Sequence, residues 1–152
     1  MSKGRRARLA AALAGAALAA CSVFAPAPPA PPPPSPHDAC SAVADSLSAA
    51  VPPGESLAEL QARGVRVRTP LSFPPGAALR PPQPSGAAVR LMINPDGTVI
   101  PGSPKVVKSI GETQIASAME GAVLSMSFDF DTGARPASPV PFTAVYAACV
   151  RS

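Results

Sequence analysis

Residues 89–99 read VRLMINPDGTV and combine an apolar strand pattern with the strongest turn sequence in the chain. In the turn, Asn94–Gly97, the proline presets φ, the aspartate caps locally and the glycine accepts a positive φ. We expect one strand at Ala87–Ile93 and a second that starts at Thr98–Ile100. After a proline-containing break the second strand continues at 106–107, so the stretch predicts an interrupted β-hairpin.

A helix and a final strand are expected after the hairpin. The helix begins at Glu112 or Thr113, and its apolar residues have spacings of four, three and four, which place them on one face. After a turn at Asp131–Gly133, Val140–Val150 has the composition of a last strand. The order β-β-α-β predicts a small α+β domain with an antiparallel sheet. The apolar residues of the helix are Ile115, Met119, Ala122 and Met126.

Residues 40–72 predict one or two short helices in front of this domain. Asp38 or Ser41 is the expected N-cap of the first helix. The second begins at Ser56, which has capping-box spacing to the glutamate three residues later. A short alternating strand is then expected at Val65–Arg68. The apolar residues of the first helix recur at four-residue spacing, at Val43, Leu47 and Val51.

The N-terminal residues have the pattern of an export signal. A basic start precedes the apolar run Leu9–Leu18 and the small residues before Cys21, as in a secretory signal peptide. The LAAC sequence that ends at Cys21 resembles the lipobox of bacterial lipoproteins. This implies removal of residues 1–20 and a membrane tether through lipid on Cys21; with Ser22 next, it implies an outer-membrane lipoprotein that faces the periplasm. An uncleaved anchor, or an ordinary signal with an incidental cysteine, is the alternative.

Residues 21–39 comprise the lipid-bearing cysteine and a proline-rich stalk. Pro26–Pro36 contains eight prolines in eleven residues, a composition that favours an extended polyproline II helix of about 3.1 Å per residue. We interpret the stalk as a spacer behind the lipid; a ligand for the aromatic groove of a partner is the alternative.

The basic charge of the whole chain belongs to the export signal. Four of the thirteen Lys and Arg residues precede Cys21 and no acidic residue does, so nine basic and nine acidic residues follow it. A domain with balanced charge has little electrostatic attraction to a polyanion, so we expect no nucleic-acid partner.

The cysteines predict a disulfide rather than a metal or catalytic site. With Cys21 acylated, Cys40 and Cys149 remain as a pair in an oxidising compartment; two separate thiols are the alternative. There is no Cys-x-x-Cys motif, and the single histidine, His37, follows the proline tract. Because acid–base catalysis most often uses histidine, we expect no enzymatic activity, no catalytic residue, no metal and no cofactor.

From residue 73 to 152 the pattern resembles the C-terminal domain of TonB-family proteins, a small ββαβ domain. The resemblance rests on the hairpin at 89–99, on Val106–Gly111, on the helix that follows and on Val140–Tyr146, with a Phe-Pro step before the first strand. The helix departs from the family at three positions, where an acid, a leucine and a tryptophan are usual. This chain has Ala116, Glu120 and Met126 there.

The resemblance implies a periplasmic protein-interaction module whose sheet edge binds a segment of an envelope or outer-membrane protein as an added strand. The last strand is the candidate edge, because Pro139 and Pro141 remove two donors from one side of it; a merely protected edge is the alternative. The resemblance also suggests an inner-membrane-anchored energy transducer, but Leu9–Ala25 would reach only about 25 Å as a helix, short of a hydrocarbon core of about 30 Å. The candidate partner-binding residues are Phe142, Thr143, Ala144, Val145 and Tyr146.

Overall fold

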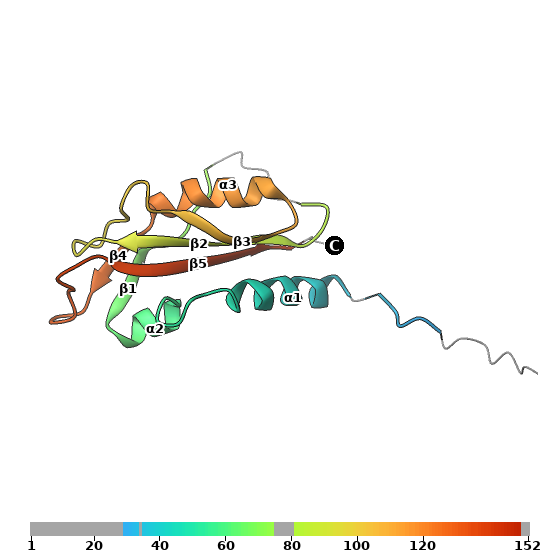
Figure 1. Ribbon diagram of the computed structural model, residues 1–152, viewed down its shortest axis with the longest axis horizontal. Helices are drawn as coiled ribbons and strands as arrows, with labels where there is room; N and C mark the ends of the chain where they lie inside the picture. The colour runs from blue at the N-terminus through green and yellow to red at the C-terminus, as the bar shows by residue number, and fades with distance from the viewer. Residues whose placement is uncertain (1–28, 34, 75–80, 150–152) are drawn as a thin grey trace, which may run out of the picture. The chain divides into compact units, whose positions relative to one another are not determined.

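A computed structural model describes residues 29–33, 35–74 and 81–149. Within this part of the chain, β2 (Ser85–Ile93) is the central strand of a three-stranded antiparallel sheet, between β3 (Lys105–Ile110) and β5 (Val140–Ala148). Helix α3 (Thr113–Ala122) covers one face of the sheet and α1 (Pro36–Ser48) covers the other (Figure 1). The sheet is therefore the middle layer of a helix–sheet–helix arrangement.

A second, two-stranded antiparallel sheet lies at one end of the domain. It pairs β1 (Val65–Thr69) with β4 (Ser127–Phe130). The short helix α2 (Leu57–Ala62) precedes β1, and the 3-10 turn η1 (Val123–Ser125) follows α3. The predicted α+β class with antiparallel sheets and preceding helices is thus confirmed. The strand at Val65–Arg68 is confirmed too, whereas β4 is a strand that the predicted β-β-α-β order lacks.

The main core lies between the sheet and α3. Alternate residues of β2 face the helix because successive strand side chains point to opposite faces. Phe128 of β4 packs edge-on against Phe142 of β5, with ring centroids 5.5 Å apart. The buried residues on β2 and α3 that form this core include Ala87, Val89, Leu91, Ile93, Ala116 and Met119.

Helix α1 begins earlier than its sequence predicts. Ser35 is the N-cap: its hydroxyl accepts a hydrogen bond from the backbone N–H of Asp38, and the Asp38 carboxylate accepts one from the backbone N–H of Ser35. The predicted caps, Asp38 and Ser41, are therefore wrong. The first helical residue is a proline. A backbone N–H at this position would have no partner within the helix, so a residue that lacks one is suited to it. The helix ends at Ser48, so Val51 lies in the loop that follows.

Contacts from α1 hold it against the sheet. Leu47 is fully buried, and a Cβ added at Gly86 of β2 would come within 2.7 Å of its Cδ1. Lys108 of β3 donates to both the carbonyl and the hydroxyl oxygen of Ser46. The Cβ added at Gly86 would also collide with the carbonyl oxygen of Tyr146 in β5, so the neighbouring strand, together with the helix, requires a glycine here.

The other helix predictions are largely confirmed. Ser56 and Glu59 form the predicted capping box of α2, and hydrogen bonds, first that from the Ser56 hydroxyl, lower the pKa of the Glu59 carboxyl. Helix α3 starts at Thr113 with Glu112 as N-cap. Its helical turns end before Met126, which is nevertheless buried.

The predicted turn at Asn94–Gly97 is present. The N–H of Gly97 donates to the carbonyl of Asn94 at 2.9 Å, and Gly97 has a φ of 88°. A Cβ at Gly97 would collide with the carbonyl oxygen of Phe128, whose N–H donates to the Gly97 carbonyl at 2.8 Å. The predicted strand at Thr98–Ile100 is reduced to isolated bridges, and the regular second strand begins only at Lys105.

Cys40 and Cys149 form a disulfide, which confirms the predicted pairing. It connects the first half of α1 to the end of β5, between residues 109 positions apart. A disulfide of this kind indicates a location outside the cytoplasm, since cytosolic thiols are kept reduced. Among the helices in the described residues, we find none with the length and apolar character needed to cross a membrane. Cys21 and the export signal lie outside the described residues.

Candidate functional site

The outer side of β5 is an edge of the three-stranded sheet, because no further strand pairs with it among the described residues. Its N–H groups alternate between β2 and the outside. The N–H of Thr143 points outward, since it donates to the carbonyl of Glu55 rather than to β2. By the period of two, Pro141, Val145 and Ala147 also face outward, and the proline has no N–H to offer.

Glu55, in the loop between α1 and α2, is fastened to this edge by main chain and side chain. Its carbonyl accepts the N–H of Thr143 at 2.9 Å, and its carboxylate accepts the Thr143 hydroxyl at 2.9 Å. Two side-chain nitrogens of Arg90 of β2 donate hydrogen bonds to the same carboxylate, at 2.8 and 2.6 Å. We call Glu55, Arg90 and Thr143 the Glu55 clip.

The carboxylate of the clip is buried, with Glu55 only 5% exposed. Burial alone would raise its pKa, but the hydrogen bonds from Arg90 and Thr143 outweigh burial and hold the pKa below the ordinary value. A carboxyl group with a lowered pKa stabilises the fold above its unfolded pKa, and this contribution is lost as the pH falls through the folded pKa. At neutral pH the Glu55 carboxylate is therefore ionised, and its hydrogen bonds with Arg90 and Thr143 are formed.

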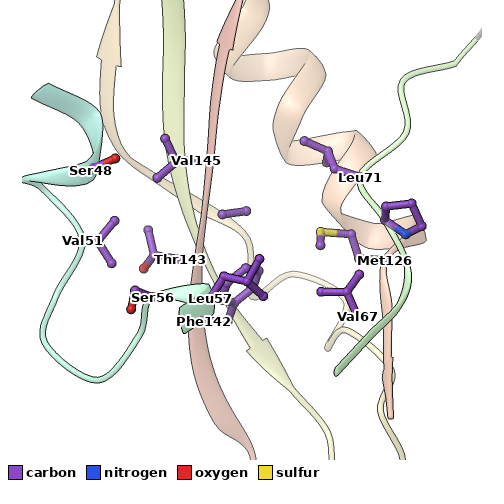
Figure 2. A pocket seen from close by; sticks show the side chains of 12 residues that line it. Ser48, Val51, Ser56, Leu57, Val67, Leu71, Met126, Phe142, Thr143 and Val145 are labelled. Atoms are coloured by element: carbon purple, nitrogen blue, oxygen red, sulfur yellow. The ribbon is translucent and has the colours of Figure 1, made fainter. Parts of the chain in front are cut away.

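An apolar groove of about 510 Å³ runs beside the clip, along β5. In Figure 2, β5 passes through the middle of the groove, with Ser48, Val51 and Ser56 on one side and Val67 and Met126 on the other. None of its lining side chains is charged. They are Ser48, Val51, Ser56, Leu57, Val67, Pro70, Leu71, Met126, Phe142, Thr143, Ala144 and Val145.

The structure brings four of the five predicted partner-binding residues to this groove. Phe142, Thr143, Ala144 and Val145 line it. Tyr146 is not among the lining residues, and its ring packs against Phe73 with centroids 4.7 Å apart. The walls on either side of β5 were missed by sequence reasoning, because they come from segments that no local motif connects to the last strand.

Two positions on the outer edge of β5 keep a backbone donor. The N–H groups of Val145 and Ala147 make no hydrogen bond with the described residues. Val145 is partly exposed and its side chain lines the groove. An edge N–H beside an apolar groove is the arrangement that accepts an extended chain, because the backbone and the alternate side chains of that chain are both accommodated.

The described part of the chain contains no group of three or more His, Cys, Asp or Glu side chains placed to hold a metal ion. No family model, curated protein or solved structure matches this sequence. The class that the fold defines is therefore a small, disulfide-bonded α+β domain with an open sheet edge.

Proposed function

We propose that this chain is an envelope lipoprotein that acts as a periplasmic protein-interaction module, with a TonB-like C-terminal domain. In this proposal β5 binds an extended segment of another envelope protein as an added strand. The observation that carries the proposal is the uncharged apolar groove beside the outward N–H of Val145. The closed end of the edge at Pro141 and Thr143 prevents indiscriminate pairing along the whole strand.

The groove also restricts the chemistry of the partner segment. Burying an unpaired charge in an apolar site is costly, and no lining side chain could neutralise one. The occupant is therefore an extended, uncharged segment with apolar side chains at alternate positions. Each backbone hydrogen bond to the edge contributes about 0.5–1.5 kcal/mol net, so most of the affinity comes from the side chains that fill the groove.

Replacing Val145 by proline tests the role of the edge. The change removes the outward N–H but no hydrogen bond to β2, so stability changes little, while binding weakens about tenfold through loss of one backbone bond and steric interference. Val145→Thr keeps the N–H and the β-branched shape and serves as the control. The probe is an extended peptide selected on the wild-type chain from a displayed random library, and its affinity is measured by calorimetry. Equal affinity for the proline variant and wild type would contradict strand addition.

The membrane tether has a separate test. Intact mass of the chain extracted from Gram-negative membranes is expected to match a mature protein that begins at acylated Cys21. The resemblance of residues 18–21 to a lipobox and the Cys40–Cys149 disulfide, which indicates a location outside the cytoplasm, support this expectation. A chain that retains residues 1–20 would contradict it and would favour the inner-membrane-anchored transducer instead.

A further inference from the structure

Glu55 occupies, on the outer edge of β5, the place of one residue of a partner strand. Its carbonyl accepts the N–H of Thr143 as a paired strand would. The edge is thus divided at this point. On one side Pro141 has no donor and Thr143 is engaged, while on the other Val145 and Ala147 keep theirs.

The side chain of Glu55 makes this arrangement rigid. The carboxylate is buried and accepts hydrogen bonds from Arg90 of β2 and from the Thr143 hydroxyl. Pulling the loop away from the edge would break the ion pair between the buried Glu55 carboxylate and the half-exposed Arg90. It would also leave the buried Thr143 hydroxyl without its acceptor, and a partner segment without charge could not replace both interactions. An uncharged segment therefore binds beside the clip and does not displace it.

The clip also shapes the groove. Ser56 and Leu57, which follow Glu55 directly, line it. Leu57 is 41% exposed although it is a large apolar residue. Fastening Glu55 to β5 thus holds one wall of the groove at a fixed position along the strand, next to the first free donor at Val145.

From these contacts we infer that Glu55 is the residue that sets the register and length of the added strand. The inference rests on the function proposed above. A partner segment pairs with β5 at Val145 and Ala147 and ends against Glu55, so its side chains enter the groove in one register. The edge offers no second pairing register two residues further along β5. Specificity then depends on which short segment has side chains that fit the groove in this single register.

Amide hydrogen exchange of the full mature chain in detergent micelles, followed residue by residue by NMR, tests the clip directly. In Glu55→Ala the Thr143 amide is expected to exchange about tenfold faster than in wild type, because its acceptor is no longer held in place. Glu55→Gln keeps the shape of the side chain but weakens its pairing with Arg90, so it should give a smaller increase in the exchange rate of Thr143. If the alanine variant does not fold, the glutamine variant provides the test. An unchanged Thr143 rate in a folded variant overturns the inference.

The opposite edge of the sheet supplies a matched control. There the Glu120 carboxylate accepts the N–H of Val106 of β3 at 3.3 Å. Glu120→Ala removes the carboxylate acceptor of an edge N–H on β3, on the edge opposite the groove, whereas at Thr143 the acceptor is the main-chain carbonyl of Glu55. It should speed exchange at Val106 and leave Thr143 unchanged, whereas faster exchange at both sites would mean general loosening and would count against a specific clip.

The library-selected peptide separates this inference from the proposed function. With wild type, the peptide should slow exchange at Val145 and Ala147 only. With Glu55→Ala it should also protect Thr143, through one added backbone bond to the amide that Glu55 no longer holds. Protection of Val145 in both proteins, without new protection at Thr143, overturns the register role and keeps the proposed function. Absence of protection at Val145 in both proteins overturns the two together.

Discussion

Replacing Cys40 by serine in the oxidised protein is expected to lower the free energy of unfolding by about 4–5 kcal/mol. The disulfide to Cys149 closes a loop between residues 109 positions apart, and a loop of that length restricts the unfolded chain strongly in the chain-entropy description. The domain from Cys40 onward has no tryptophan and only four phenylalanines and one tyrosine, so its core is small and the crosslink supplies a large share of its stability.

Urea unfolding of the wild type, Cys40→Ser, Cys149→Ser and the double variant measures this contribution. Since both single changes break the same bond, each should lose as much as the double variant. Wild type under reducing conditions should match them. A loss under about 1 kcal/mol in the single variants would contradict the prediction, because it would mean that the loop is closed equally well without the bond.

The features predictable from sequence are those encoded within a few neighbouring residues. The capping box needs only Ser56 and Glu59, and the turn at Asn94–Gly97 needs only its own proline and glycine. The face of α3 follows from helical spacing alone. The N-cap signal of α1 is local as well, but Ser35 lies inside the proline tract that predicts a stalk. Asp38 is not the cap itself and completes the capping box as the third helical residue.

Features that depend on distant partners were not predictable. Phe128 and Phe130 form a strand because β1 pairs with them, and β1 lies far away in sequence: Arg66 of β1 bonds Asp131, 65 positions later. Without that partner, four residues carry too weak a signal for a strand. At Thr98–Ile100 the β-rich composition was misleading, because the chain turns away after single bridges.

The candidate site also has a part that local sequence predicts and a part that only distant contacts create. Pro139 and Pro141 mark β5 as an edge, so that part could be inferred from sequence. The Glu55 clip could not, because its partners Arg90 and Thr143 lie 35 and 88 positions away and a lone glutamate in a loop is usually solvated. The groove required the loop after α1 and the segment after β1 to meet at β5, which only tertiary packing decides.

The aromatic pair of Phe128 and Phe142 connects the geometry of the groove to the stability of the core. Phe128 is 1% exposed and its ring meets that of Phe142 at 5.5 Å. Phe142 in turn lines the groove. The backbone of Phe128 also donates to the Gly97 carbonyl, so one residue joins the hairpin turn, β4 and the floor of the groove.

Phe128→Ala is therefore expected to lower the free energy of unfolding by about 3–5 kcal/mol, through lost burial and the cavity that the ring leaves. It should also weaken binding of the selected peptide in the fraction that stays folded, because Phe142 loses its support. Phe130→Ala, on the same strand but only partly buried, is the matched control. Urea unfolding and calorimetric titration at low temperature measure the two effects. Equal destabilisation by the two variants would show that Phe128 is not the main core contact, and undiminished binding to folded Phe128→Ala would show that the groove does not depend on the aromatic pair.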